Sequence, residues 1–260
     1  MSRPRAVRIL LTILASITPF NVLFAQSGTF TTTGSLSVAV IEHTETTLPN
    51  GLVLAAGGQG SNSVAIANAE LYSSTTGRFT PTSSMNSPRT GHTATLLSSG
   101  LVLIAGGINS SQQTVSSAEL FSQSTDKFTN TGGMHVARWA HTATLLQNGE
   151  VLAAGGDNNA NGLLASAEIY NPSNSRWSTT GSMLISAEGR TATLLPSGLV
   201  LVTGGFAGSG ATAEAELFNP ATGKFTATGS MNTPRNAHRA GRPLRHALAE
   251  RNGFDRGRGG

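Results

Sequence analysis

One phrase returns along this chain at a fixed spacing, and this periodicity constrains the fold more than any other feature. The stretch HTATLLSSGLVLIAGG begins at His92, and copies begin at His141, at Arg190 and, with more changes, at His43. The second glycine of the copies falls at positions 58, 107, 156 and 205, in steps of 49 residues. A period of this length indicates a repeat architecture, in which each unit buries its apolar face against its neighbours.

Each unit is expected to form four short β-strands. HTATLL is the first strand, the apolar run LVLIAGG is a buried second strand, and AELF is the third. A phrase rich in threonine, such as FTNTG, is the fourth, because threonine and aromatic residues favour pleated surfaces. It opens at Phe79, Phe128, Trp177 and Phe225, and an earlier copy opens at Phe30. Four strands in 49 residues are the size of one propeller blade.

These units resemble kelch repeats. The features that carry the resemblance are the Gly-Gly pair after an apolar strand, the tyrosine or phenylalanine some 14 residues later, and the aromatic residue that opens the fourth strand. The sub-type is similar to the propeller of galactose oxidase-like proteins, and the resemblance covers about residues 28–238. It implies an all-β, kelch-type β-propeller. Kelch rings usually close with more than four blades, so four blades over about residues 36–230 should form an incomplete propeller, an open arc.

The two ends of the chain are expected to lie outside the four blades. Residues 1–25 have the basic start and apolar stretch of a signal peptide, with cleavage after Ala25, which predicts a secreted, periplasmic or cell-surface protein. An uncleaved anchor is the alternative, although the apolar stretch, residues 9–24, is short for a membrane span. Residues 26–35 are expected to be the lone outer strand of a ring-closing blade.

Residues 231–260 start as a fifth repeat and then lose the pattern. MNTPRNAH resembles MNSPRTGH upstream, but the arginine-rich stretch that follows it does not spell TATLL. Read one nucleotide later, codons for residues 245–258 can spell ATLLPNGMVLIAGG, close to ATLLSSGLVLIAGG at 94–107. We therefore expect residues from about 239 onward to be a frameshifted blade that is disordered and carries no site. A basic tail that binds anionic surfaces is the alternative.

The composition limits the partners. The formal net charge is +4, but residues 26–234 contain seven basic and eleven acidic residues, which gives no support to nucleic-acid binding. The chain has no cysteine, so it has no disulfide and no thiolate metal site. The copper chemistry of galactose oxidase relatives uses tyrosine, histidine and a cross-linked cysteine. Without cysteine, and with Tyr72 and Tyr170 at a repeated strand position, that activity does not carry over, and we predict no enzyme activity.

Charged residues recur with the repeat, which favours a structural role over a catalytic one. Glu70, Glu119, Glu168 and Glu216 share one position of the repeat, and Arg89, Arg138 and Arg235 share another. We expect hydrogen bonds or ion pairs between neighbouring strands, with Glu119 and Glu168 substantially buried. The histidines recur as well, at His43, His92, His141 and His238, with Arg190 in the remaining unit. They could line a channel and bind a metal, but backbone hydrogen bonding is the expected role.

One segment matches the pattern of a calcium-binding loop. In DNNANGLLASAE, Asp157, Asn159, Asn161 and Glu168 would supply oxygen ligands. The glutamate already belongs to the repeat, no helix flanks the loop, and other units lack the aspartate. The alternative is a loop rich in asparagine and glycine, and we predict no metal and no cofactor.

The segments that join the second and third strands differ most between units. They read QGSNSVAIAN, INSSQQTVSS, DNNANGLLAS and FAGSGATAEA, and topology places them with the fourth-to-first connections at one end of the blades. Divergent loops on constant strands indicate a binding surface for an unknown protein or carbohydrate. The expected function is a non-catalytic binding module, with self-association through uncovered terminal blades. The alternatives are a fragment of a carbohydrate oxidase without its catalytic residues and a non-functional, truncated remnant.

Overall fold

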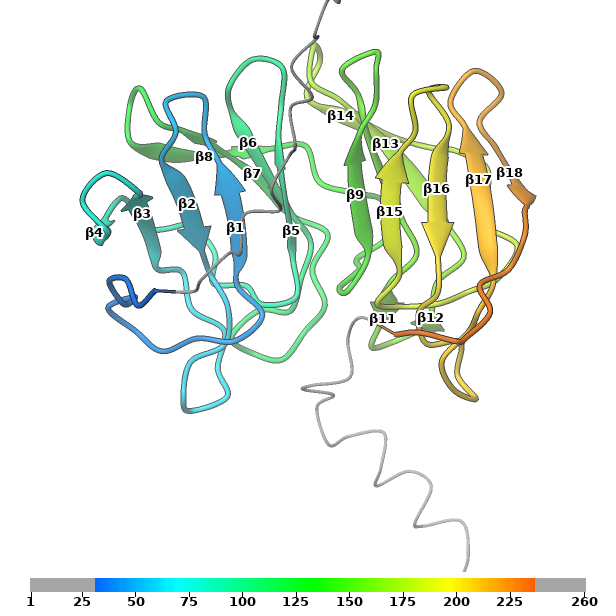
Figure 1. Cartoon of the computed structure of the whole chain (residues 1–260), viewed down its shortest axis with the longest axis horizontal. Helices are drawn as coiled ribbons and strands as arrows, with labels where there is room; N and C mark the ends of the chain where they lie inside the picture. Colours follow the sequence, from blue (N-terminus) through cyan, green and yellow to red (C-terminus); the bar gives the residue numbers. More distant parts are fainter. Residues whose placement is uncertain (1–30, 237–260) are drawn as a thin grey trace, which may run out of the picture. The chain divides into compact units, whose positions relative to one another are not determined.

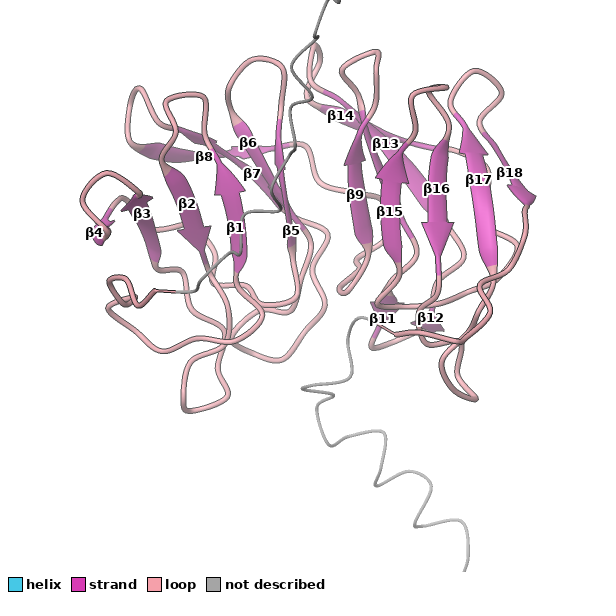
Figure 2. Cartoon of the chain, viewed as in Figure 1, coloured by secondary structure: helices cyan, strands magenta, loops and turns pink. Residues whose placement is uncertain are grey.

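The computed structural model describes residues 31–236, and all regular structure in that range is β (Figure 1, Figure 2). The chain forms two compact units, residues 1–32 and 33–260, and every described strand belongs to the second. The signal peptide expected at residues 1–25 and the tail from residue 237 lie outside the described residues. No helix in the described range is long and apolar enough to cross a membrane.

The strands form four antiparallel sheets of four strands each, and each sheet is one repeat. We call them blades 1 to 4. Their strands are, for blade 1, β1 (Thr44–Thr47), β2 (Val53–Ala56), β3 (Ala69–Ser73) and β4 (Arg78–Pro81); for blade 2, β5 (Thr93–Leu96), β6 (Val102–Ala105), β7 (Ala118–Ser122) and β8 (Lys127–Thr131); for blade 3, β9 (Thr142–Leu145), β10 (Val151–Ala154), β13 (Ala167–Asn171) and β14 (Arg176–Thr179); and for blade 4, β15 (Thr191–Leu194), β16 (Val200–Thr203), β17 (Ala215–Asn219) and β18 (Lys224–Ala227). A small hairpin, β11 (Asp157–Asn158) and β12 (Gly162–Leu163), stands between β10 and β13.

Glycine fixes the end of each second strand. Strand β6 ends at Ala105, directly before Gly106 and Gly107, and both glycines have positive φ. A Cβ on Gly106 would lie 2.4 Å from the carbonyl oxygen of Arg138, in the connection between β8 and β9. Only glycine combines this conformation with so close a backbone approach, since a side chain at positive φ is strained as well as obstructed. The Gly-Gly pair therefore brings each blade against the segment that leads into the next one.

The apolar cores lie between blades. One face of each sheet packs against the opposite face of the next sheet, so each blade completes its core with residues of its neighbour. The core between blades 2 and 3 shows the pattern and includes Leu103, Ala105, Met134, Val151, Ala153, Tyr170 and Trp177. Equivalent cores join blade 1 to blade 2 and blade 3 to blade 4. Packing between repeats, rather than within one, holds the fold together.

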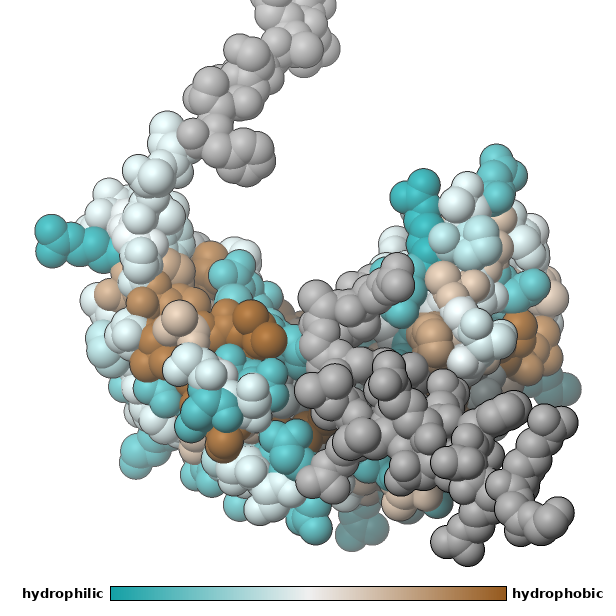
Figure 3. Space-filling view, turned by 90° about the horizontal axis from the view of Figure 1, so that it is seen from below, coloured by the Kyte–Doolittle hydropathy of each residue, from teal (hydrophilic) through white to brown (hydrophobic). Residues whose placement is uncertain are grey.

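The blades follow one another in chain order within the second unit. The first strands β1, β5, β9 and β15 pack side by side in that sequence. Strands β1 and β15 do not pack on each other as neighbouring first strands do, and the described surface is an open arc (Figure 3). The outer face of blade 4 lacks the cover that internal faces have: Leu195 is half-buried, whereas its equivalents Leu48, Leu97 and Leu146 are buried. The all-β, incomplete propeller predicted from the sequence is confirmed.

The segment before blade 1 bonds to that blade as a fourth strand bonds to the next blade. Gly34 donates its N–H to the carbonyl of Gly77 (2.8 Å), as Gly181 does to Gly223 (2.9 Å). The hydroxyls of Thr33 and Tyr72 lie 2.8 Å apart, matching the 2.7 Å between the hydroxyls of Thr131 and Tyr170. Residues 31–36 form no assigned strand, and Phe30 lies outside the described range. The ring-closing role of residues 26–35 therefore stays a prediction.

Candidate functional site

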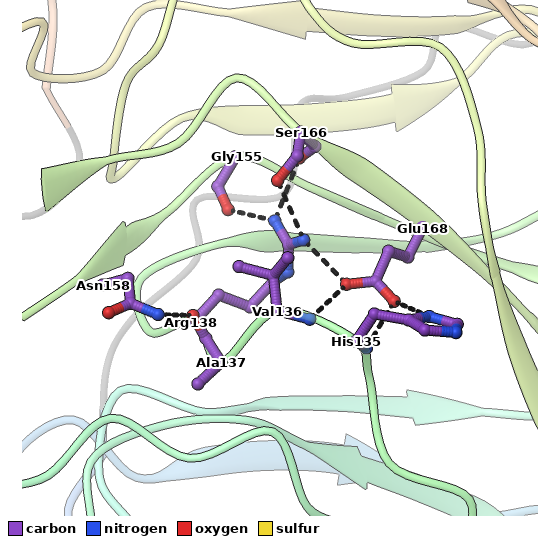
Figure 4. A network of polar contacts seen from close by, with 8 residues as sticks. All are labelled: His135, Val136, Ala137, Arg138, Gly155, Asn158, Ser166 and Glu168. Atoms are coloured by element: carbon purple, nitrogen blue, oxygen red, sulfur yellow. Dashed lines mark hydrogen bonds and ion pairs between the residues drawn. The ribbon is translucent and has the colours of Figure 1, made fainter. Parts of the chain in front are cut away.

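A buried ion pair ties each internal blade to the segment that precedes it, and Figure 4 shows the pair of blade 3. Arg138, between β8 and β9, donates from Nη1 to the carbonyls of Gly155 (2.8 Å) and Ser166 (2.9 Å). Its Nη2 donates to Oγ of Ser166 (3.2 Å) and to Oε1 of Glu168 (3.0 Å) on β13. Burial lowers the pKa of Arg138, although the bond with Glu168 opposes that shift. The two terminal nitrogens of the guanidinium are thus both held by oxygen acceptors, whereas the buried Nε has none.

Glu168 closes the network on its other side. Its carboxylate accepts the backbone N–H of His135 (2.7 Å) and of Val136 (3.0 Å), and it bonds to the His135 ring (2.9 Å). Burial raises the pKa of Glu168, but the hydrogen bonds from His135, Val136 and Arg138 outweigh burial and leave that pKa below its usual value. Both carboxylate oxygens are engaged, which is the arrangement of a structural group rather than a catalytic one.

The same network recurs in blade 2, and blade 4 keeps the arginine–glutamate pair with a different arginine. The predicted burial and bonding of Glu119, and likewise of Glu168, are confirmed. Arg89 lies 2.7 Å from Glu119 in blade 2, and both side chains are buried. In blade 4, Ala187 stands at the arginine position, and Arg190, three residues later, reaches Glu216 at 3.0 Å. Periodicity places Arg190 at the histidine position and does not predict this pairing, for which the available signal was an arginine three residues after an absent one.

Two members of the repeated charge set form no arginine–glutamate pair. Glu70 of blade 1 is buried, and its carboxylate accepts hydrogen bonds from the N–H and hydroxyl of Ser37. The expectation of a hydrogen bond or an ion pair is therefore confirmed for Glu70, with a backbone donor in place of an arginine. Arg235 follows blade 4, its side chain is exposed, and it forms no ion pair within residues 31–236. The expected pairing is thus wrong for Arg235.

The recurring histidines His92 and His141 each form a separate hydrogen bond. Nε2 of His92 bonds to the hydroxyl of Thr44 (3.0 Å), and Nε2 of His141 bonds to that of Thr93 (3.0 Å). Burial lowers the pKa of His92 to about 3 and the pKa of His141 well below its usual value. Both histidines thus bond to a threonine of the preceding blade, and the expected backbone hydrogen bond is present for His92, with Arg89. His238 lies outside the described residues, and no group of three metal-ligating side chains occurs within residues 31–236.

The calcium-loop pattern does not come together as a single site. Glu168 is held by the arginine network, away from the β11–β12 hairpin that begins at Asp157. The side-chain amide of Asn159 donates to the carbonyl of Gln112 (3.0 Å) in the neighbouring loop, and the backbone of Asn161 closes the turn on Asn158 (2.8 Å). The ligand set inferred from the pattern is therefore divided between a buried network and an exposed hairpin.

Both tyrosines serve packing, as their repeated position predicts. The ring of Tyr170 is buried against Trp177 with ring centroids 5.2 Å apart, and its hydroxyl bonds to Thr131 of the preceding blade. Tyr72 packs in the same way against Phe79, at 4.8 Å. Their side chains connect neighbouring repeats.

The loops between second and third strands form one surface, which we call the loop face (residues 57–68, 106–117, 155–166 and 204–214). In Figure 1 these loops leave the lower ends of the blades, near β11 and β12. Three hydrogen bonds join the loops of blades 1 to 3: Gln112 Nε2 to Ser63 O (3.1 Å), Asn159 Nδ2 to Gln112 O (3.0 Å) and Asn159 N to Thr114 Oγ1 (3.2 Å). Side chains that differ between repeats thus hold adjacent loops together.

Open hollows lie between neighbouring blades at the opposite end of the described repeats. One lies between blades 2 and 3 and is lined by Ser98, Asn148, Glu150, Asn171 and neighbouring turn residues. Another repeats this arrangement between blades 3 and 4. Both follow from the spacing of the turns, so they are a property of the repeat.

Comparison with known proteins agrees with this geometry. The family model of the kelch motif matches residues 138–184, which run from Arg138 through blade 3. Blade 3 thus matches the kelch motif, and blades 1, 2 and 4 repeat its strand order at the same spacing. A solved structure titled "Structure of YjhT" is similar, with a TM-score of 0.62 and 16% identity over 77% of this chain and 68% of that chain. A search of curated protein sequences finds no match. The kelch repeats establish the propeller fold, which supports a binding or structural module in general.

Proposed function

We propose that this chain is a secreted, non-catalytic kelch module that binds a protein or a glycan through the loop face. The observation that carries the proposal is the series of hydrogen bonds between loops, from Ser63 through Gln112 to Asn159. These bonds set exposed polar loops of three blades side by side before any ligand arrives. A surface ordered in advance loses less conformational entropy on binding.

The composition of the loop face favours polar recognition. Its loops are rich in serine, asparagine and glycine, and Phe206 is the only aromatic residue in them. Aromatic rings are the usual stacking platforms for sugars, so a glycan ligand would depend on hydrogen bonds here. A protein ligand that presents backbone and polar side-chain groups fits the same chemistry, and the two classes give different results in a binding screen.

The test is a screen of the full chain against a glycan array and a displayed protein library, followed by loop variants. Gln112→Ala and Asn159→Ala should weaken binding of any ligand found. Asn148→Ala, in a turn at the opposite end of blade 3, is the matched control and should leave binding unchanged. Equal effects of the loop and control variants, or a ligand mapped to the opposite end, would contradict the proposal.

Two further measurements address secretion and catalysis. Expression of the full chain should yield a mature protein that begins at Gln26, as sequencing of its N-terminus would show. After dialysis against copper, a peroxide-coupled assay with galactose and related sugars should give no activity above a metal-free control. Copper-dependent peroxide formation would instead support the oxidase alternative.

A further inference from the structure

Blade 1 contains a pocket beside its repeated glutamate. The pocket is small and partly open to solvent, and its lining includes Leu36, Val40, Gly57, Asn68 and Glu70. The Glu70 side chain is only 5% exposed, and it accepts bonds from the N–H (3.0 Å) and hydroxyl (2.6 Å) of Ser37. No cationic side chain within residues 31–236 forms an ion pair with it. Glu70 is thus a buried carboxylate without the partner that its equivalents have.

The same place in blade 2 holds a guanidinium group. Arg89 donates from Nη1 to the carbonyls of Gly106 (2.8 Å) and Ser117 (3.0 Å), and from Nη2 to Glu119 (2.7 Å). One repeat earlier in the sequence, the acceptors are Gly57, Asn68 and Glu70, which all line the pocket. The carbonyl of Asn68 accepts the N–H of Gly57, as that of Ser117 accepts the N–H of Gly106, so the backbone around the pocket has the same hydrogen bonding.

The pocket lacks its arginine because of one substitution in the repeat. Val40 stands one repeat before Arg89, so a short apolar side chain begins where the arginine side chain would begin. The acceptors further along that path are retained. Blade 1 therefore combines the acceptor set of a guanidinium site with no covalently attached guanidinium among the described residues.

In blade 4 the repeated glutamate pairs with an arginine at a different position of the chain. Ala187 stands at the arginine position there, and Arg190 enters from three residues later to reach Glu216 at 3.0 Å. The feature kept in blades 2, 3 and 4 is the pairing of the glutamate with a guanidinium, whatever its origin. A planar group that donates several hydrogen bonds matches separate carbonyl and carboxylate acceptors better than an ammonium does.

We propose that the blade 1 pocket is a binding site for an alkylguanidinium group, with Glu70, Gly57 O and Asn68 as acceptors. Its alkyl part would lie against Leu36 and Val40. The source is either a free guanidino compound or an arginine side chain of a second copy of this chain. Arg235 could be that arginine. Its backbone is held as that of Arg138 is, since Gly205 N donates to the Arg235 carbonyl (2.8 Å) as Gly107 N does to the Arg138 carbonyl (2.9 Å). Its side chain, unlike that of Arg138, is exposed and therefore accessible to a second copy. The site does not depend on a ligand at the loop face.

The first experiment titrates the full chain with methylguanidinium, and with methylammonium at equal ionic strength, and follows valine and leucine methyl resonances. Methylguanidinium should bind saturably and shift methyl groups of blade 1, at least tenfold more tightly than methylammonium. Glu70→Gln should weaken binding about tenfold or more, because a charged acceptor is lost. Glu150→Gln is the control: Glu150 lies in the turn before β10 of blade 3, and its variant should bind normally.

Val40→Arg supplies the guanidinium from the chain itself and should abolish methylguanidinium binding while raising the Tm. The source is distinguished by light scattering across a range of chain concentrations. If a second copy supplies the group, the wild type should self-associate, and Val40→Arg and Arg235→Gln should each abolish that association. The proposal is overturned if methylguanidinium binds no better than methylammonium and neither variant changes self-association. It is also overturned if Val40→Arg and Glu70→Gln both bind as the wild type does.

Discussion

Replacing Glu168 by alanine tests whether the repeated ion pair holds the blades together. Glu168 is fully buried, and its carboxylate accepts from Arg138 and from two backbone N–H groups of the preceding segment. The variant removes the negative partner and leaves the Arg138 guanidinium buried with only its bonds to Gly155 and Ser166. An uncompensated buried charge, not a lost contact alone, is the source of the expected destabilisation.

The expected loss is about 3–5 kcal/mol, the range for removing one member of a buried pair. For a protein of this size it corresponds to a decrease in Tm of between about 6 and 20 °C. Thermal unfolding followed by far-UV circular dichroism measures it. Tryptophan fluorescence gives a local signal, because Trp139 and Trp177 both pack in or beside blade 3.

Blade 1 offers the matched control. Glu70→Ala removes a glutamate from the same repeat position, but it leaves no arginine behind, since Ser37 is the bonded residue there. Its cost should be about 1–2 kcal/mol, the penalty for unpaired polar groups. In a third variant, Arg138→Met combined with Glu168→Leu, most of the stability lost in Glu168→Ala should return. If Glu168→Ala and Glu70→Ala cost the same, or if the double variant is no better than Glu168→Ala, the reasoning is wrong.

Three further results are expected. Gly106→Ala should lower the free energy of unfolding by far more than the cost of positive φ, about 1–2 kcal/mol, because the new Cβ would lie 2.4 Å from a carbonyl oxygen. Gly51 has a similar φ and open space around it, so Gly51→Ala should show the cost of positive φ alone. Urea unfolding measures both variants. The pKa values of His92 and His141 are lowered in the folded state, so the unfolded chain binds more protons as pH decreases. The free energy of unfolding should therefore be highest above about pH 6.5 and decrease below it, by up to about 1.4 kcal/mol per pH unit for each histidine. His92→Gln should halve the slope of this pH dependence. Millimolar calcium should leave Tm unchanged in the wild type and in Asp157→Asn, as differential scanning fluorimetry would show.

The sequence predicts most of this fold because each structural requirement recurs at one interval. Glycine after an apolar strand, an aromatic on the third strand and a turn before the fourth strand coincide in every copy, so one unit confirms another. The boundaries differ by a residue or two: β5 is Thr93–Leu96, whereas the pattern HTATLL begins at His92. The hydrogen-bonded strand is thus shorter at both ends than the stretch with the repeated side-chain pattern.

The individual side-chain partners were harder to predict, because they depend on direction in space. Periodicity placed Glu168 and Arg138 at repeated positions. In blade 4 the nearness of Arg190 to the alanine at position 187 was the only sequence signal that it replaces the expected arginine. The bonds of His92 and Asn159 to neighbouring blades likewise join residues 48 and 45 positions apart. Such contacts follow from the angle between blades, which the sequence of one blade does not encode.

The position of the arginine relative to its blade determines which piece of this chain could be exchanged as a unit. A block that begins at Met134 and ends before Met183 includes Arg138, Glu168 and the backbone donors of His135 and Val136, so it could be duplicated or transplanted with its polar network intact. A block that begins at the first strand, at Thr142, would leave its arginine behind and resemble blade 1. Recombination within this family should therefore favour junctions before the connecting segment rather than at the edge of the sheet.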